Sequence, residues 1–298
     1  MSSLSELSND IAGLVEKASG SVVRVDARRG RAGTGIAWDK DLVLTANHVV
    51  EQDDEIEVGV GERTLKATLA GRDPATDLAL LKVEGLNAPA MERAKVADLK
   101  PGQIVLAIGR PGGLKATFGT ISAVSSSWRG WRGSEIEHLI QTNAPLYPGF
   151  SGGPLVDVEG RAVGMNSWVF GRGDGRAIAM DVAERVVESL RTDGRIKRAY
   201  LGVGTQQVQL PESVRSKVSQ ESGLLVISVD PKSGAERAGI MQGDTLLAID
   251  GAGTATLEDL YRKIRTLKVG GTTRVKIVRG GEVKELTLTV AEAGQQEN

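Results

Sequence analysis

The sequence around Ser151, LYPGFSGGPL at residues 146–155, has a composition suited to a reactive hydroxyl. Three glycines and two prolines surround the single serine, and the apolar run LVDV follows at once. A flexible linker would carry more polar residues and would not continue directly into a strand. Glycines on both sides of a hydroxyl allow another molecule to approach the backbone closely. We therefore interpret Ser151 as a candidate nucleophile.

A serine hydroxyl is a weak nucleophile until a neighbouring base, usually histidine, accepts its proton. The chain has two histidines. His48 lies in LTANHVV, at the end of an apolar run, whereas His138 lies in the strand-like run EIEHLIQT and is interpreted as a packed or surface residue. Spacing alone does not choose an orienting acid among 38 carboxylates. Asp77 is attractive because it opens the apolar run DLALLKV, although an aspartate before a strand is ordinarily a turn residue.

The composition argues against several other classes of function. Without cysteine, the chain has no disulfide, no catalytic thiol and no cysteine-ligated zinc, and two histidines do not suggest a histidine-rich metal site. A formal net charge of -1 disfavours nucleic acid as the main partner. The glycine-rich runs GRPGGLKAT and KVGGTTR do not match a phosphate-binding loop. We expect no cofactor and no metal.

The N-terminal sequence also bears on location. No stretch of eighteen or more apolar residues is present, so no membrane span is expected. Residues 1–20, MSSLSELSNDIAGLVEKASG, have neither a basic n-region nor an apolar h-region. As written, the sequence indicates a cytoplasmic protein, or an extracytoplasmic one if the N-terminus was trimmed.

The elements that must position these residues are mostly short strands. From about residue 20 to 180, apolar runs of four to eight residues alternate with turn signals, and no long helical pattern separates them. This spacing favours antiparallel barrels over βαβ units. A break at 87–102 suggests two successive barrels. Residues 10–18 are predicted to form a short helix at best, and 181–193 a helix with one apolar face.

The region after residue 198 has a different pattern. Strand-like runs at 200–208, 223–230 and 244–251 precede a helix whose start is framed by Thr256 and Asp259. A hairpin turning at Gly280-Gly281 closes the region. These elements predict a small α+β module.

The motifs carry a resemblance when they are taken together. LTANHVV, TDLALLKV and IQTNAPLYPGFSGGPLV resemble the histidine, aspartate and serine motifs of the HtrA/Deg family of trypsin-like serine proteases, over roughly residues 20–292. Their order along the chain is the chymotrypsin-type order. The resemblance implies a mainly β fold, a chymotrypsin-like double antiparallel β-barrel followed by a small α+β PDZ domain. The implied parts are an N-terminal segment 1–19, a trypsin-like protease domain 20–193, a linker 194–198, a PDZ domain 199–293 and a tail 294–298.

The resemblance also implies roles for individual residues. Ser151 attacks the scissile carbonyl, His48 accepts its proton and later protonates the leaving amine, and Asp77 orients the imidazole. The backbone amides of Gly149 and Ser151 form the oxyanion hole.

Two departures from the family leave alternatives open. Phe150 stands where the family usually has asparagine, and NAPLYPG stands where it usually has DAAINPG, so the resting oxyanion loop has either an active or an inactive shape.

Trp128 and Trp131, in the segment where the family has a regulatory loop, suggest either contact with a partner or plain packing. In NSWVFGRGDGRAIA, which resembles the specificity segment, Val169, Phe170 and Ile178 favour small or medium aliphatic side chains before the cut; charged residues dominating the cleavage sites would contradict this.

The motif YLGV at residues 200–203 resembles a PDZ carboxylate-binding loop of the HtrA type. The resemblance implies that the amides of Leu201, Gly202 and Val203, in the loop that Tyr200 opens, receive a terminal carboxylate. An extended peptide would add as a strand, with Leu201, Val203 and Ile264 lining the pocket for its last side chain. The alternative is a module that only packs against the protease.

The function implied is that of an ATP-independent serine endopeptidase that cleaves unfolded or damaged proteins. Its PDZ domain would bind C-terminal or extended peptides for recruitment or regulation. The expected partners are unfolded polypeptides, peptide ligands and further copies of the chain, a trimer by analogy with the family. The alternatives are a latent or inactive chaperone or peptide-binding scaffold of the same fold, and an esterase that uses the same triad.

Overall fold

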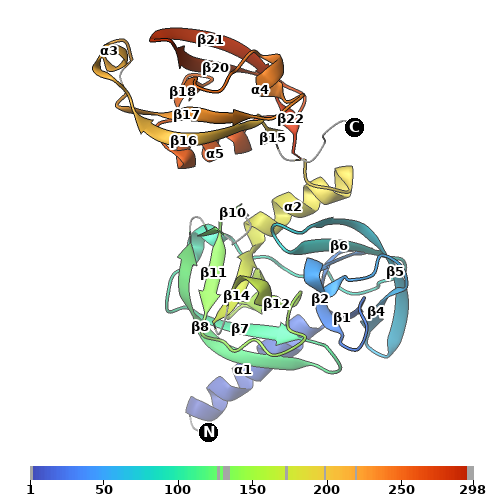
Figure 1. The fold of residues 1–298 in the computed structure, drawn as a ribbon. Helices are drawn as coiled ribbons and strands as arrows, with labels where there is room; N and C mark the ends of the chain where they lie inside the picture. The colour runs from blue at the N-terminus through green and yellow to red at the C-terminus, as the bar shows by residue number, and fades with distance from the viewer. Residues whose placement is uncertain are drawn as a thin grey trace. The chain divides into compact units, whose positions relative to one another are not determined.

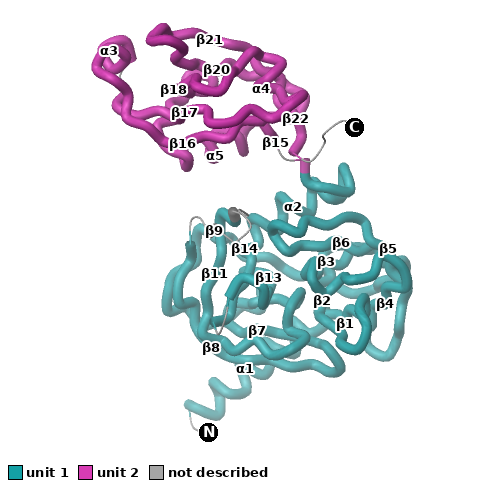
Figure 2. The backbone as a smooth tube through the Cα atoms, in the orientation of Figure 1, with its two compact units in different colours: residues 1–196 teal, residues 197–298 magenta. Residues whose placement is uncertain are grey.

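The computed structural model describes residues 3–125, 128–129, 135–171, 174–197, 199–218 and 220–293. The chain divides into two compact units, residues 1–196 and residues 197–298 (Figure 2). Each unit has its own hydrophobic core. The two units are therefore described separately.

The first barrel of unit 1 is a closed, six-stranded antiparallel sheet (Figure 1). In sheet order its strands are β1 (Val22–Asp26), β2 (Gly33–Asp39), β3 (Leu42–Ala46), β6 (Leu78–Val83), β5 (Arg63–Asp73) and β4 (Ile56–Val60). Valine, isoleucine and leucine dominate these runs because such side chains pack well on a buried pleated surface. Strand β3 is buried along its whole length.

The second barrel is also closed and six-stranded, which confirms the predicted double barrel. In sheet order its strands are β11 (Leu139–Thr142), β14 (Gly175–Ala179), β13 (Ala162–Asn166), β12 (Pro154–Val156), β7 (Ile104–Gly109) and β8 (Lys115–Ser125). The segment between β6 and β7 contains one bridge residue, Arg93, and a 3₁₀ turn, η2 (Val96–Asp98), but no named strand, as the break at 87–102 indicated. The strands β9 (Trp128–Arg129) and β10 (Glu135–Ile136) pair only with each other among the described residues. Of the two tryptophans predicted to contact a partner or pack, Trp131 lies outside the described residues and Trp128 is described only as backbone.

Two helices complete unit 1. Helix α1 (Ser3–Ser19) is 17 residues long, so the expectation of a short helix within 10–18 was wrong. Leu4 and Leu7 extend the three-and-four spacing of Ile11 and Leu14 toward the N-terminus, which is the pattern of a helical stripe. Helix α2 (Met180–Asp193) forms as predicted. Its buried face consists of Met180, Val182, Ala183, Val186, Val187 and Leu190.

Unit 2 is an α+β module, as predicted. One sheet contains, in order, β16 (Val203–Gln209), β17 (Ser222–Val229), β18 (Thr245–Ile249), β20 (Thr272–Arg279) and β21 (Glu282–Thr289), with β19 (Ala252–Gly253) beside β18. The short strands β15 (Ala199–Tyr200) and β22 (Ala291–Glu292) pair near the ends of the unit. Its helices are α3 (Glu212–Arg215), α4 (Gly234–Arg237) and α5 (Leu257–Arg265).

Two local features of unit 2 confirm predictions from sequence. Thr256 and Asp259 form a reciprocal capping box at the start of α5. Gly280 and Gly281 both have positive φ in the turn that joins β20 to β21, as a two-residue hairpin of this type requires. Among the described helices, none is long and apolar enough to cross a membrane.

Candidate active site

The predicted base and acid lie at adjacent ends of two paired strands. His48 is in the 3₁₀ turn η1 (Asn47–Val49), which follows β3, and Asp77 directly precedes β6. Strands β3 and β6 pair as far as Ala46 and Leu78, so the residues that follow and precede them meet. The Asp77 carboxylate lies 2.8 Å (Oδ2) and 3.0 Å (Oδ1) from His48 Nδ1, and Oδ1 also accepts from the His48 backbone N–H at 2.9 Å.

The Asp77 carboxylate is buried and fully occupied by donors. Only 2% of the residue is exposed. Ser167, which follows β13, donates its hydroxyl to Asp77 Oδ2 at 2.6 Å. A buried carboxylate that already accepts these bonds has a fixed orientation and holds the imidazole in a single plane. The sequence analysis missed Ser167, because a lone serine before a tryptophan gives no signal of a contact 90 residues away.

Two consecutive turns present Ser151. Phe150 N–H donates to Tyr147 O at 3.0 Å, and Gly153 N–H donates to Phe150 O at 3.0 Å. The third residue of each turn, Gly149 and Gly152, has φ of +92° and +86°. Turns of this kind require positive φ at that position, which glycine adopts without strain. The glycines of LYPGFSGGPL are therefore explained by the backbone path as well as by space for a second molecule.

The backbone amides on either side of Phe150 are free. Neither Gly149 N–H nor Ser151 N–H donates a hydrogen bond within the part of the chain that the structure describes, whereas the carbonyls of Gly149, Phe150 and Ser151 all accept one. Free amides beside a serine hydroxyl are what an oxyanion hole requires. A side chain at Gly149 would lie 2.4 Å from Pro111, so only glycine fits there.

The hydroxyl of Ser151 is not bonded to His48 in this structure. Ser151 Oγ instead accepts from Trp168 N–H at 3.4 Å, and His48 Nε2 has no hydrogen-bond partner among the described residues. Catalytic hydrogen bonds are often long or open before substrate binds. The structure thus brings His48 and Asp77 into direct contact, while the link between His48 and Ser151 is open.

Phe150, the departure from the family pattern, is fully buried. Its ring belongs to the core of the second barrel and meets Tyr147 edge to face, with 5.9 Å between ring centroids. A Cβ at Gly109 would lie 2.7 Å from the ring, so the missing side chain of Gly109 makes the space that Phe150 fills. An apolar anchor therefore lies between the two free amides.

Phe150→Ala is expected to lower stability and activity together. Truncating a buried phenylalanine typically lowers the free energy of unfolding by about 3–5 kcal/mol. Here the cavity would form at the residue between the free amides of Gly149 and Ser151. Ile121→Ala is the matched control, because Ile121 is buried in the same core but lies in β8, outside the loop that carries Ser151. Thermal unfolding and peptidase rates would be measured for both variants well below their melting temperatures. Equal rates for the two variants would contradict an anchoring role for Phe150.

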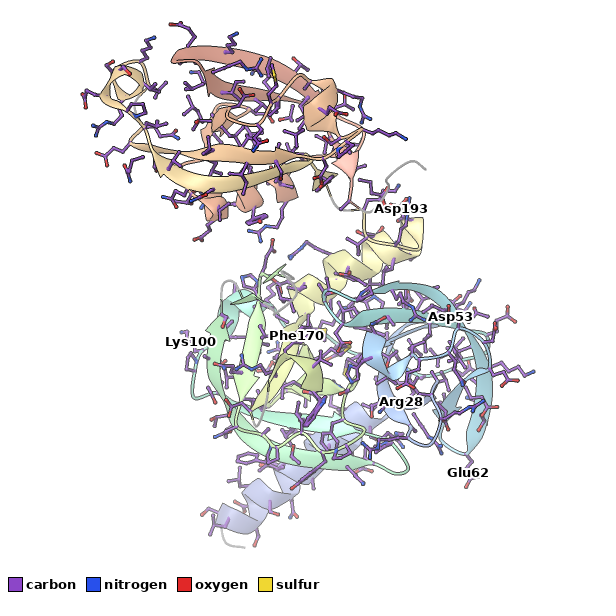
Figure 3. All side chains as sticks on the ribbon, viewed as in Figure 1. Arg28, Asp53, Glu62, Lys100, Phe170 and Asp193 are labelled. Atoms are coloured by element: carbon purple, nitrogen blue, oxygen red, sulfur yellow. The ribbon has the colours of Figure 1, made fainter. Side chains whose placement is uncertain are left out.

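The residues expected to shape specificity are divided by the structure. Phe170 lies in the 3₁₀ turn η3 (Trp168–Phe170) and is buried within unit 1 (Figure 3), and Ile178 is fully buried in β14 as part of the hydrophobic core. Val169 is half exposed, and Trp168 is 66% exposed. The exposed apolar surface near Ser151 therefore comes from the turn η3 and not from β14.

The predicted peptide-binding residues of unit 2 come together at one edge of its sheet. Leu201 and Gly202 are buried between β15 and β16, and Gly202 has φ of +86°. Their carbonyls accept from Ala235 N–H and Asp230 N–H, both at 2.9 Å, whereas their own N–H groups donate to nothing among the described residues. The Tyr200 hydroxyl bonds to Asp230 and anchors the start of this loop.

The strand that follows the loop has a free edge. Strand β16, which begins at Val203, pairs only with β17 in the sheet and contacts helix α5. Ile264 lies on α5 and packs against the core of unit 2 together with Val203. An edge strand beside a helix is the arrangement to which an extended peptide can add.

Comparison with known proteins identifies both units. Residues 33–165 match the family model of the trypsin-like peptidase domain, and residues 199–290 match that of the PDZ domain. The solved structure of the HtrA-type protease AlgW with a tripeptide is similar over 94% of this chain and 96% of that chain, with 32% identity and a TM-score of 0.77. The chain belongs to the HtrA-type family of serine proteases. A serine endoprotease from Yersinia pestis is similar over 94% of this HtrA-type chain and 97% of its own, with 30% identity and a TM-score of 0.77.

Curated relatives agree with this HtrA-type assignment. A probable periplasmic serine endoprotease, DegP-like, of Pseudomonas fluorescens is 37% identical over 265 residues, which cover 87% of this chain and 56% of the relative. A protein of the same description from Ectopseudomonas mendocina is 38% identical over 274 residues, covering 89% of this chain and 58% of the relative. The chain thus spans somewhat more than half the length of these relatives. Among the described residues, no group of three or more acidic or histidine side chains could hold a metal ion.

Proposed function

We propose that the chain is an ATP-independent serine endopeptidase that cleaves unfolded or damaged proteins. The observation that carries the proposal is the buried Asp77 carboxylate that holds His48 Nδ1, together with the free amides of Gly149 and Ser151 in the loop that presents the serine. Structural histidines also pair with carboxylates, but free amides flanking a serine have no structural role of their own.

The protonation of the pair follows from its hydrogen bonds. A carboxylate only accepts, so His48 Nδ1 carries the proton that points at Asp77. The lone pair is then on Nε2, the ring atom for which the described residues supply no partner. Turning the Ser151 side chain from Trp168 N–H toward Nε2 would make the base–nucleophile contact.

The reaction would proceed by acyl transfer. Ser151 Oγ attacks the peptide carbonyl while His48 takes its proton, and the amides of Gly149 and Ser151 bind the developing oxyanion. The imidazolium, stabilised by Asp77, gives its proton to the leaving amine. Water then attacks the acyl-enzyme with His48 acting again as base.

Unfolded chains are the substrates that this site favours. Trp168, whose N–H contacts Ser151 Oγ, is 66% exposed, and Tyr147, in the same loop as Ser151, is 56% exposed. Exposed rings can contact apolar side chains that a folded protein would bury. Nothing in the sequence resembles a nucleotide-driven unfoldase, so the substrate must already be locally extended.

Reduced, carboxymethylated α-lactalbumin and the native protein provide the direct test. We expect cleavage of the unfolded form by the wild type and not by Ser151→Ala, with the native form left intact. Equal cleavage of both forms would overturn the preference for unfolded substrates. Binding of the unfolded form without cleavage would favour the scaffold alternative, and hydrolysis of p-nitrophenyl esters alone would favour an esterase.

We further propose that unit 2 binds the C-terminal carboxylate of an extended peptide. The free N–H groups of Leu201 and Gly202 support this, together with the unpaired edge of β16. AlgW, the solved relative, was obtained with peptides. Ile264, on α5, would contact the last side chain of the peptide.

Ile264→Ala in the Ser151→Ala background is expected to weaken binding of a decapeptide ending in valine at least about tenfold, because an apolar pocket would lose several methylene contacts. Arg265→Ala, an exposed change on the same helix, is the control. Fluorescence anisotropy would compare the free-acid peptide with its C-terminal amide. Equal affinity for acid and amide would contradict carboxylate capture.

The exposed face of α1 and the names of the relatives bear on assembly and location. The exposed Leu4 and Leu7 on α1 offer an apolar surface for contact between copies, and we propose a homo-oligomer, a trimer as the family resemblance implies. Because the curated relatives are named periplasmic, we propose an extracytoplasmic location. Light scattering and cell fractionation would test the two points, and a monomer or a purely cytoplasmic protein would contradict them.

A further inference from the structure

A threonine of the first barrel makes a set of hydrogen bonds to the loop that presents Ser151. Thr34 lies in β2 and is fully buried. Its Oγ1 donates to Gly149 O at 2.6 Å and accepts from Arg110 N–H at 2.8 Å. One hydroxyl thus uses its single proton on the carbonyl of the residue that supplies the first free amide.

The backbone of Thr34 contacts the other side of the nucleophile. Thr34 N–H donates to Ser151 O at 3.1 Å, and Thr34 O accepts from Thr45 Oγ1 at 2.7 Å. The approach is close, because a Cβ at Gly152 would lie 2.0 Å from Thr34 O. Thr34 therefore holds the carbonyls of both residues whose amides are free.

These bonds fix the orientation of the peptide unit between the two amides. The Gly149–Phe150 peptide is planar, with its carbonyl on Thr34 Oγ1 and its N–H on Tyr147 O at 3.0 Å. Rotating this peptide would break both bonds and leave the buried O–H donor of Thr34 and the Gly149 carbonyl without each other as partners. The same rotation would change the backbone angles at Gly149 and Phe150 and re-aim the amides on each side.

We propose that the Thr34 hydroxyl is a positioning group for the oxyanion hole, acting across the two barrels through the Gly149 carbonyl. The inference rests on the proposed function, since it concerns the hole that the endopeptidase would use. Thr34 touches no reacting atom. Its role is to keep the amides of Gly149 and Ser151 aimed at one point before substrate arrives, which is the condition for strong transition-state stabilisation.

Thr34→Val removes the hydroxyl and keeps the shape of the side chain. The Gly149 carbonyl and Arg110 N–H then lose their shared partner. We expect kcat to fall about 100-fold, the order of effect seen when one oxyanion donor is lost. KM should change less than about threefold, because ground-state binding does not use the oxyanion. Thr34→Ser keeps the hydroxyl and should restore most of kcat.

Thr142 provides a matched control for the loss of a buried threonine hydroxyl. Thr142 is also buried, and its Oγ1 also donates to a carbonyl, Thr120 O at 2.8 Å, and accepts from an amide, Ala144 N–H at 3.1 Å. Thr142→Val should lower the melting temperature to a similar degree, with kcat within about threefold of the wild type. A purely structural role for Thr34 would make the two variants alike.

The experiment measures kcat and KM on reduced, carboxymethylated α-lactalbumin and the rate of fluorophosphonate labelling for wild type, Thr34→Val, Thr34→Ser, Thr142→Val and Ser151→Ala. Slow cleavage and slow labelling in Thr34→Val, with rescue by serine, support the inference. An unchanged kcat, a fall in kcat equal to that of Thr142→Val, or an effect confined to KM overturns it.

If Thr34→Val does not fold, Thr34→Cys gives the same comparison, because a thiol is only a weak donor. A wild type that neither cleaves nor labels would overturn the proposed function and this inference together, whereas an active wild type with an equally active Thr34→Val overturns this inference alone.

Discussion

Replacing Ser151 by alanine will lower the rate of peptide-bond hydrolysis on the order of a million-fold, the loss typical when the nucleophile of such a triad is removed. Within the described part of the chain, the side chain of Ser151 makes one hydrogen bond, which it accepts from Trp168 N–H at 3.4 Å, so its loss removes little else. The rate on reduced, carboxymethylated α-lactalbumin would be measured with enzyme in large excess to detect slow turnover.

The fold and the binding of substrate should survive this change. The two turns around residue 151 are made by backbone groups, and alanine leaves them in place. Ser151→Ala should therefore melt near the wild-type temperature and still bind the unfolded protein. Residual cleavage above about one part in a thousand would show that another residue acts as nucleophile.

Replacing Asp77 by asparagine will lower kcat by about four orders of magnitude, the size of effect found when the acid of a triad becomes an amide. The amide offers N–H groups, and a donor facing His48 Nδ1 would move the ring proton to Nε2, where the base must be unprotonated. The Ser167 hydroxyl would remain nearby, so the pocket itself keeps its shape. Kinetics with the unfolded substrate would provide the measurement.

Asp73 is the matched control for this substitution. It is a buried aspartate at the end of β5, paired with Leu78 of β6, and it accepts from Thr76 Oγ1 at 2.7 Å and from Ala75 N–H at 3.3 Å. Asp73→Asn should affect stability more than kcat. Similar losses of kcat in the two variants would contradict the orienting role proposed for Asp77.

Much of the fold could be predicted because its signals are local. Short apolar runs and turn residues predicted two barrels, and the capping box of Thr256 and Asp259 predicted the start of α5. Helix α1 was underestimated because its N-terminal half is largely polar and its leucines are exposed, so the helical spacing was the only evidence. Local patterns predict elements better than they predict how far a weakly packed helix extends.

The contacts that complete the site could not be predicted, because they join residues far apart in sequence. Thr34 reaches Gly149 across 115 positions, and Ser167 reaches Asp77 across 90. A serine or threonine in a strand gives no indication of its partner until the barrels are placed. The motif residues were found because the chemistry requires their residue types. The serine and threonine that hold them could not be told apart from the many other hydroxyl residues with similar sequence surroundings.

Phe150 shows how one departure from a family pattern has a structural explanation. From sequence alone, replacing the usual asparagine left the shape of the loop open between active and inactive forms. In the structure the ring fills the space left by Gly109, and Thr34 holds the carbonyl before it. Apolar packing and a hydroxyl bond together hold the loop with both amides free.

Intact-mass labelling of the wild-type chain with a fluorophosphonate, without any added protein, tests the central claim most directly. The account predicts one adduct per chain, located on Ser151 and absent from Ser151→Ala, because the His48–Asp77 pair and the free amides of Gly149 and Ser151 are present before substrate binds. Labelling only after an unfolded protein is added would contradict an oxyanion hole formed at rest. No labelling under either condition would contradict the catalytic site itself.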